Sequence, residues 1–146
     1  MPKILVVFHS DTGNTRRAAE LVTEGAGGVE GVDAELVEAM DVDPEAVVDA
    51  AGVAIGSPDY YSYMAGQVKV FYDRVFHVRD RLKGKPGAVF ITHGGGGKAM
   101  ESMVKLSGSV NLELVGEGLS IKNSPSGDDE AACRDLGRKL AEAAAG

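Results

Sequence analysis

The fold is decided near the N-terminus by the sequence KILVVFHSDTGNT, residues 3–15. Its uninterrupted apolar run, Ile4 to Phe8, predicts a strand over Lys3–His9 that is buried on both faces, as in a parallel sheet. A short polar loop follows, and a helical pattern then runs from about Asn14 to Ala26, where two glycines end it. Strand, polar loop and helix in this order form the first half of a unit in which parallel strands alternate with helices.

Further strands and helices are expected downstream, because short apolar runs bounded by glycine, proline or aspartate alternate with segments of helical period. The expected strands are Val32–Val37 at an edge of the sheet, Gly52–Gly56, Ala88–Thr92 and Leu112–Ile121. The expected helices are Pro44–Asp49, the longest one with its apolar residues between Met64 and Leu82, one from about Lys98 to Ser107, and Asp128–Ala145 with Ser126 as its N-cap and acidic residues in its first turn.

This alternation predicts an α/β fold in which a doubly wound, five-stranded parallel sheet lies between two layers of helices, a three-layer αβα arrangement. We expect the strand order 2-1-3-4-5 and a single domain that spans residues 1–146. In such a sheet, ligands bind beyond the carboxyl ends of the strands, where the winding reverses. The loops after strands 1, 3 and 4 are therefore the candidates for a binding site.

Composition narrows the possible functions. The 15 basic and 22 acidic residues give a net charge of −7, which disfavours binding to nucleic acids or anionic lipid. No apolar run approaches the roughly 18 residues that a membrane span needs, and the chain enters its first strand without a cleavable leader. The single cysteine, Cys133, cannot form an internal disulfide and, with three histidines, argues against a metal site. We expect a cytoplasmic protein that is a monomer or a homodimer.

The first of the three loops carries groups that suit a phosphate. Ser10, Thr12 and Thr15 each offer a hydroxyl, and the N–H groups at the start of the following helix have no intrahelical acceptor. No lysine lies in this loop, so it does not match the P-loop of ATP-hydrolysing proteins. The alternative interpretation is that these residues only cap the helix.

The second and third loops offer aromatic and backbone contacts to a planar ligand. Three of the four tyrosines lie in the second loop, Gly56–Gln67, where the alternative is ordinary packing on neighbouring segments. The third loop, Thr92–Lys98, contains four consecutive glycines, whose N–H groups can approach a ligand edge closely, unless the loop is merely a flexible connection. His93 has two possible roles, contact with the ligand and termination of its strand.

The pattern Ser-x-Thr-Gly-x-Thr at residues 10–15 resembles the loop with which flavodoxins bind the phosphate of FMN. The stretch Gly56–Arg74 resembles the second flavin loop and following helix of FMN-dependent NAD(P)H:quinone oxidoreductases. The resemblance implies a flavodoxin-like FMN flavoprotein with no metal and no catalytic side chain. The cofactor-binding residues that it implies are Ser10, Asp11, Thr12, Gly13, Asn14, Thr15, Ser57, Pro58, Asp59, Tyr60, Tyr61, Met64, Gly66, Thr92, His93, Gly94, Gly95, Gly96 and Gly97.

The resemblance also places Asp59 and Tyr60 nearest the flavin ring, where an anion lowers the reduction potential. Flavodoxins commonly stack the ring between a tryptophan and a tyrosine, and this chain has no tryptophan, so one face of the ring is expected to be open, as hydride transfer requires. The quinone reductases usually carry an added segment after their fourth strand, for which the short stretch between Thr92 and Leu112 leaves little room.

These features favour an electron carrier that docks on redox partner proteins with basic surfaces, since the chain is small and carries a net charge of −7. One alternative is an NAD(P)H:quinone oxidoreductase or flavin reductase that acts on small quinone or NAD(P)H substrates. A more remote alternative is a scaffold without flavin.

Other proteins with this architecture fit less well. A response regulator needs a pair of acidic residues after the first strand, where Asp11 stands alone. A low-molecular-weight tyrosine phosphatase needs a cysteine in the first loop, whereas Cys133 belongs to the last predicted helix. A cobalamin-binding module needs the run Asp-x-His-x-x-Gly, which the sequence does not contain.

Overall fold

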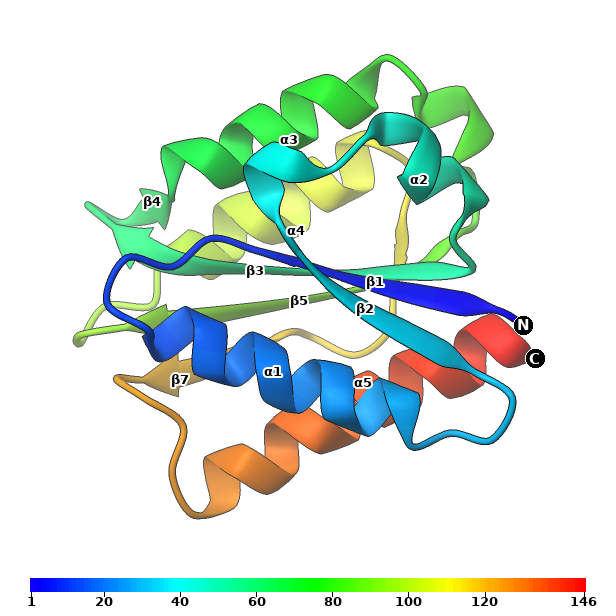
Figure 1. The fold of residues 1–146 in the computed structure, drawn as a ribbon. Helices are drawn as coiled ribbons and strands as arrows, with labels where there is room; N and C mark the ends of the chain where they lie inside the picture. Colours follow the sequence, from blue (N-terminus) through cyan, green and yellow to red (C-terminus); the bar gives the residue numbers. More distant parts are fainter.

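The computed structural model describes residues 1–146 and consists of a sheet between two layers of helices (Figure 1). The strands are β1 (Lys3–Phe8), β2 (Asp33–Glu38), β3 (Gly52–Tyr60), β4 (Tyr63–Met64), β5 (Pro86–His93), β6 (Glu113–Leu114) and β7 (Leu119–Lys122). The helices are α1 (Asn14–Gly27), α2 (Pro44–Asp49), α3 (Gly66–Phe76), α4 (Ala99–Ser109) and α5 (Asp128–Ala145), with short 3₁₀ turns at Ala39–Asp41 and Arg79–Arg81. None of the helices combines the length and the apolar character that a membrane crossing requires.

The sheet has the order β2-β1-β3-β5, and both β6 and β7 pair with the outer side of β5. These pairs are all parallel, whereas β4 is antiparallel to β3 and forms a short hairpin with it. With β6 and β7 counted as one interrupted strand, the order is the expected 2-1-3-4-5. The predicted doubly wound α/β fold is therefore confirmed.

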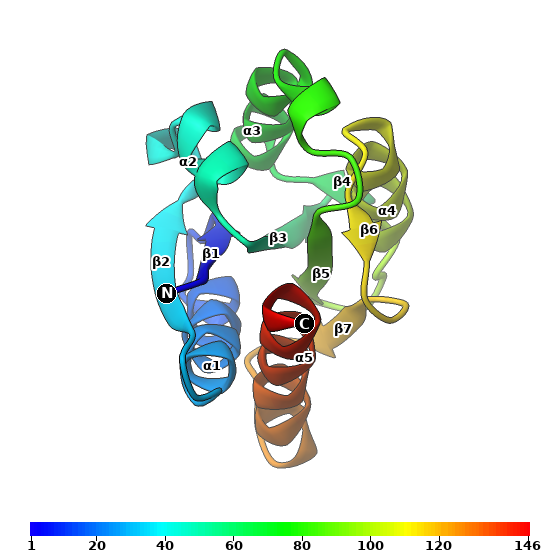
Figure 2. The same cartoon turned by 90° about the vertical axis from the view of Figure 1, so that its right-hand side faces the viewer.

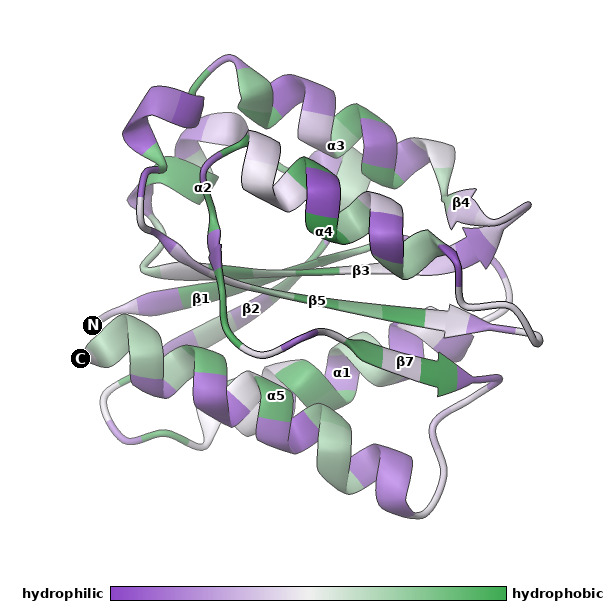
Figure 3. Cartoon of the chain, turned by 180° about the vertical axis from the view of Figure 1, so that it is seen from behind, coloured by the Kyte–Doolittle hydropathy of each residue, from purple (hydrophilic) through white to green (hydrophobic).

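Two hydrophobic cores fill the space between the sheet and its helices. One lies against α2, α3 and α4 and buries Phe71 and Met103; the other lies against α1 and α5 and buries Leu21 and Leu140. Figure 2 shows the two layers on opposite faces of the sheet, and Figure 3 shows hydrophobic and hydrophilic residues alternating along α3, α4 and α5, as amphipathic helices require. The run Ile4–Phe8 is apolar throughout because β1 is buried between both cores.

Helices α1 and α5 approach each other closely at two glycines. A Cβ atom on Gly25 would overlap the carbonyl oxygen of Arg134, and one on Gly137 would overlap the carbonyl oxygen of Val22. The backbones therefore touch without intervening side chains, as only glycine permits. This contact fixes α1, whose first turn belongs to the candidate site, against the rest of the molecule.

The prediction of one strand over Leu112–Ile121 is wrong. Two short strands, β6 and β7, are separated by residues 115–118, in which Gly116 and Gly118 have φ angles of 73° and 96°. An extended strand does not contain such angles, so the chain leaves β5 after Leu114 and returns to it at Leu119.

The predicted long helix is also wrong in its extent. Helix α3 ends at Phe76, and Leu82 lies beyond the 3₁₀ turn at Arg79–Arg81. Leu82 is nevertheless buried, so its spacing indicated burial and not helix length. The longest helix is α5, with 18 residues; its first turn contains the expected acidic residues, but its N-cap is Gly127 and not Ser126.

The carboxyl ends of β1, β3 and β5 lie at one edge of the sheet, on the left in Figure 1, and both chain termini lie at the opposite edge. Parallel pairing places these three strand ends side by side, with Phe8 opposite Gly56 and Pro58 opposite Thr92. The three candidate loops therefore meet at one place.

Candidate functional site

The loops after β1, β3 and β5 surround a hollow of about 160 Å³ at the carboxyl edge of the sheet. Its lining residues are Ser10, Asp11, Thr12, Asn14, Thr15, Pro58, Asp59, Tyr60, Thr92, His93, Gly94 and Asn123. All of these except Asn123 belong to the set that the sequence predicts. The predicted residues that do not line the hollow are Gly13, Ser57, Tyr61, Met64, Gly66, Gly95, Gly96 and Gly97.

A larger groove, of about 620 Å³, lies between α1 and α5, far from these loops. Most of its charged side chains already pair with one another, as Arg134 does with Glu24 and Arg138 with Glu142. None of its lining residues belongs to the set that the sequence predicts, so we place the candidate site at the smaller hollow.

The start of α1 has backbone N–H groups without protein acceptors. Gly13, with φ of 101°, is the N-cap, and no side chain caps the helix. The N–H of Gly13 donates to Ser10 Oγ at 3.1 Å, which closes the loop, whereas the N–H groups of Asn14, Thr15 and Arg16 donate to no protein oxygen. Unpaired N–H groups at the positive end of a helix dipole form a binding site for an anion.

A pair of hydroxyls connects the first loop to the third. Thr15 Oγ1 and Thr92 Oγ1 are 2.7 Å apart, and both residues are buried on the floor of the hollow. One hydroxyl donates to the other, so the acceptor of this bond keeps its own proton for a ligand oxygen. Thr12, by contrast, is exposed at the rim of the hollow.

The second loop is a β-hairpin, so the prediction that residues 57–60 lie in a loop is wrong. Strand β3 continues to Tyr60, turns through Tyr61 and Ser62, and returns as β4. The φ angles of Tyr61 and Ser62 are 54° and 68°, as in a two-residue type I′ turn, which usually contains asparagine and glycine. The sequence lacks that signal. Tyr61 is fully exposed at the tip of the hairpin.

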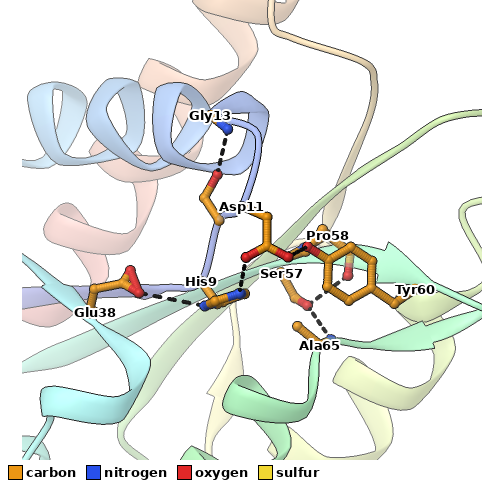
Figure 4. Close-up of polar contacts among 9 residues, drawn as sticks. His9, Asp11, Gly13, Glu38, Ser57, Pro58, Tyr60 and Ala65 are labelled. Atoms are coloured by element: carbon orange, nitrogen blue, oxygen red, sulfur yellow. Dashed lines mark hydrogen bonds and ion pairs between the residues drawn. The ribbon is translucent and has the colours of Figure 1, made fainter.

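Ser57 and Met64 hold the hairpin to its own helix and do not face the hollow. Ser57 Oγ donates to the carbonyl of Pro58 at 2.8 Å and accepts the N–H of Ala65 at 2.9 Å, as Figure 4 shows. Met64 is buried, and Gly66 is the first residue of α3. These three predicted residues thus support the position of the hairpin.

Asp59 connects the hairpin to the third loop. Its Oδ1 accepts the N–H of Ser62 at 2.9 Å, and its Oδ2 accepts the N–H of Ala99, the first residue of α4, at 3.0 Å. Both carboxylate oxygens therefore hold backbone N–H groups while the side chain lines the hollow.

The third loop supplies further donors without partners. None of the N–H groups of Gly94–Gly97 donates to a protein oxygen. In the adjacent His93, which lines the hollow, the ring nitrogen Nδ1 is buried and has no hydrogen-bond partner. A buried polar atom without a partner is costly, so these groups are consistent with a ligand that accepts and donates hydrogen bonds at this edge.

Asp11 connects the first loop to the hairpin. Its Oδ2 accepts the hydroxyl proton of Tyr60 at 2.5 Å, and its Oδ1 lies 3.1 Å from Nε2 of His9 (Figure 4). The hydrogen bond from Tyr60 holds the pKa of Asp11 below its usual value. Burial, assisted by this hydrogen bond, raises the pKa of Tyr60 to about 12. The carboxylate is therefore charged and the phenol neutral at physiological pH.

Asn123 is the lining residue that the sequence reasoning missed. It follows β7, and its N–H donates to the carbonyl of His93 at 2.8 Å. Its φ angle of 61° lies in the left-handed region, which asparagine tolerates better than most residues. The predicted strand end at Ile121 was a signal for it, because the residues that follow a parallel strand lie at the same sheet edge as the other loops.

The comparisons with known proteins agree with this fold. A family model described as Flavodoxin matches residues 6–137. The chain belongs to the flavodoxin family. Family membership implies a flavin cofactor. The hollow described above, with its unpaired hydrogen-bond donors, is the candidate site for it.

Relatives of two kinds are similar over the whole chain. A flavodoxin from Aquifex aeolicus is 34% identical over 160 aligned positions, which cover 97% of this chain and 86% of that protein. An NAD(P)H dehydrogenase (quinone) from Archaeoglobus fulgidus is 30% identical over 187 positions, which cover 99% of this chain and 98% of that protein. A solved structure of a flavodoxin from the domain Archaea has a TM-score of 0.91 and 27% identity, with 99% of each chain covered.

Proposed function

We propose that this flavodoxin-family protein is an FMN-binding electron carrier. The observation that carries the proposal is the row of unpaired N–H groups at Asn14, Thr15 and Arg16, beside the hydroxyls of the same loop. A terminal phosphate needs several donors at one point, and a helix N-terminus provides them without a lysine or arginine in the loop. The hollow of about 160 Å³ would suit a phosphate and its chain better than a whole ring system, and the hairpin and the glycine loop would hold the ring.

The flavin supplies the redox chemistry, and the protein binds and tunes it. The unpaired N–H groups of Gly94–Gly97 would stabilise negative charge on the edge of a flavin bound there. Tyr60 and Asp59 line the same hollow, and hydrogen bonds fix both side chains. No side chain in the hollow is needed to transfer a proton or to form a covalent bond.

The size of the chain favours a carrier over a reductase. The alignment with the quinone dehydrogenase extends over 187 positions and the one with the flavodoxin over 160, against 146 residues in this chain, so the quinone dehydrogenase has more inserted residues relative to this chain. A small domain with a net charge of −7 is suited to transient docking on basic redox partners. A cytoplasmic location is part of the proposal, supported by the single, buried Cys133.

A second candidate function is an FMN-dependent NAD(P)H:quinone oxidoreductase. It is favoured by the relative from Archaeoglobus fulgidus, which is similar over 99% of this chain, and by the lack of a tryptophan to cover the ring. In that case NAD(P)H and a quinone replace protein partners.

An anaerobic potentiometric titration of the FMN-loaded protein separates the two functions. Two resolved one-electron steps, with no oxidation of NAD(P)H in the presence of a quinone, are expected for a carrier. A single two-electron step with rapid NAD(P)H oxidation would reject the carrier in favour of the reductase. Failure of the purified chain to bind FMN would reject both.

A further inference from the structure

The side chain of Asp11 bridges two segments of the site that are far apart in the sequence. It accepts the hydroxyl proton of Tyr60 from the hairpin at 2.5 Å, and it lies 3.1 Å from the ring of His9 at the end of β1. Asp11 and Tyr60 both line the hollow, whereas His9 does not, and its side chain is only 11% exposed. Figure 4 shows Asp11 between these two partners.

His9 lies between two carboxylates from different elements. Its Nε2 faces Asp11, and its Nδ1 is 3.5 Å from Oε1 of Glu38 at the end of β2. Two residues of β3 lie near His9. The carbonyl of Gly56 accepts the backbone N–H of His9, and Tyr60 is hydrogen-bonded to Asp11 and not to the His9 ring. A neutral imidazole has one N–H for these two carboxylates, whereas a protonated ring donates to both. Protonation of His9 also changes the net formal charge of the side chains of His9, Asp11 and Glu38 from −2 to −1.

The charge on Asp11 matters because Asp11 belongs to the same loop as the anion-binding N–H groups. A carboxylate held by a phenol and an imidazole is stabilised where it lies and turned toward the hairpin. A carboxylate without these partners is free to rotate within a loop that binds an anion, and the two like charges then repel each other.

We propose that Asp11 is a positioning residue that couples the phosphate-binding loop to the hairpin, and that a proton on His9 strengthens this coupling. The inference rests on the proposed function, because the ligand whose affinity depends on this coupling is a flavin with a terminal phosphate. A flavin without the phosphate contacts the ring side of the site and does not sense the charge of Asp11. The ratio of the dissociation constants of riboflavin and FMN therefore measures the coupling.

The first test removes only the Tyr60 hydroxyl. In Tyr60→Phe, the riboflavin/FMN ratio is expected to fall about fivefold, a modest coupling between neighbouring groups, because Asp11 loses the donor that holds it. The matched control is Tyr63→Phe, which changes the residue paired with Tyr60 across the hairpin and leaves Asp11 untouched. If Tyr60→Phe weakens riboflavin and FMN equally, Tyr60 acts on the ring alone and the inference is overturned.

A double-mutant cycle checks that the effect passes through the carboxylate. In an Asp11→Asn background, which has no charge to position, Tyr60→Phe is expected to leave the riboflavin/FMN ratio unchanged. A further fall of the same size in that background would show that Tyr60 acts independently of Asp11, which overturns the inference. This cycle uses exposed or partly exposed residues, so the variants are expected to fold.

The role of a proton on His9 is tested by comparing the riboflavin/FMN ratio at about pH 5 and at about pH 8 in the wild type and in a variant that cannot carry the charge. His9→Gln keeps a hydrogen-bond donor but carries no charge. At each pH, the riboflavin/FMN ratio of the wild type is divided by the riboflavin/FMN ratio of His9→Gln. This quotient is expected to fall about fivefold as pH rises, because only the wild type can lose a charge at this position. The ionisation of the FMN phosphate itself affects both proteins equally and cancels. His77→Gln, at the exposed end of α3, is the control and should behave as the wild type.

The outcomes separate the inference from the function on which it rests. Tight FMN binding with a ratio that responds neither to Tyr60→Phe nor to His9→Gln would overturn the inference and leave the proposed function intact. The absence of any flavin binding by the wild-type chain would overturn both.

Discussion

At the scale of single residues, two aspartates join the three loops of the site. Asp11 connects the first loop to the hairpin, and Asp59 connects the hairpin to the start of α4. The sequence predicts Asp59 as an anion beside the flavin. In the structure, the N–H groups of Ser62 and Ala99 share its charge, so its effect on the reduction potential is expected to be smaller than that of a free carboxylate.

Replacing Thr12 by alanine tests the phosphate loop. Thr12 is exposed at the rim of the hollow, so its loss should leave the stability of the protein unchanged. A hydrogen bond to a charged group contributes about 1.5–3 kcal/mol, and we expect FMN affinity to fall at least tenfold in a fluorescence titration. Ser109→Ala, at the far end of α4, is the control. Unchanged affinity would remove Thr12 from the phosphate site.

The burial of Tyr60, together with its hydrogen bond to Asp11, predicts a loss of stability at alkaline pH. The folded protein keeps the Tyr60 proton up to a pKa of about 12, against an ordinary value of about 10. The folded state therefore binds this proton more tightly, and the stabilisation is complete below about pH 10 and is lost as pH rises toward 12.

This loss can be measured by chemical denaturation between pH 10 and 12. The free energy of unfolding should fall more steeply in the wild type than in Tyr60→Phe. Both proteins retain Tyr72, whose pKa is also raised by burial, so the difference between them isolates Tyr60. Parallel curves would mean that Tyr60 ionises alike in the folded and unfolded chains.

At the scale of elements, the position of the first loop of the candidate site depends on the contact between α1 and α5. The first turn of α1 carries the unpaired N–H groups, and the other end of the helix is fixed where Gly25 and Gly137 meet the opposite backbone. A side chain at either glycine must push the helices apart.

Gly137→Ala is therefore expected to destabilise the protein by about 1–3 kcal/mol, the usual cost of overpacking, although alanine favours helix by about 1 kcal/mol. Gly108→Ala in α4 is the matched control, because nothing lies within 4 Å of a Cβ at that position. That substitution should be neutral or stabilising in thermal unfolding. A stabilised Gly137→Ala variant would show that the two helices can separate at little cost.

The sequence predicts the central strands correctly. Its predictions are wrong where a segment belongs to a strand because of backbone pairing and not because its residues are apolar. β1 and β5 are apolar runs buried on both faces, so hydrophobicity alone locates them. Residues 57–60 are largely polar, and they belong to β3 because Ser57 and Pro58 pair with the end of β5 and Asp59 pairs with β4. In the candidate site, loop residues such as Thr12 and Thr15 can be predicted from local spacing. The contacts of Asp11 and His9 cannot be predicted in this way. Tyr60 contacts Asp11, and Glu38 contacts His9, only because the fold brings distant parts of the sequence together.

At the scale of the whole molecule, ligand binding and folding are linked. The lone Cys133 belongs to α5 and is fully buried in the core between the sheet, α1 and α5. Burial raises the pKa of its thiol to about 11, so the folded protein presents neither access nor a thiolate to a labelling reagent near neutral pH.

Labelling of Cys133 should therefore proceed only through unfolding. FMN at 100 times its dissociation constant is expected to slow the labelling about a hundredfold, because a ligand that binds only the folded state reduces the unfolded population by that factor. The rate can be followed by mass spectrometry with an alkylating reagent. Labelling that is independent of FMN would instead indicate that α5 opens locally.

The placement of the two chain ends has a practical consequence. Met1 and Gly146 lie at the sheet edge opposite the hollow, and the eight residues of β5 separate these edges by about 26 Å. A tag or a surface attached at either end leaves the candidate site facing outward and accessible to partners. A second redox protein fused at either end can exchange electrons with the flavin only through a linker long enough to pass around the sheet, and shortening that linker should abolish the exchange.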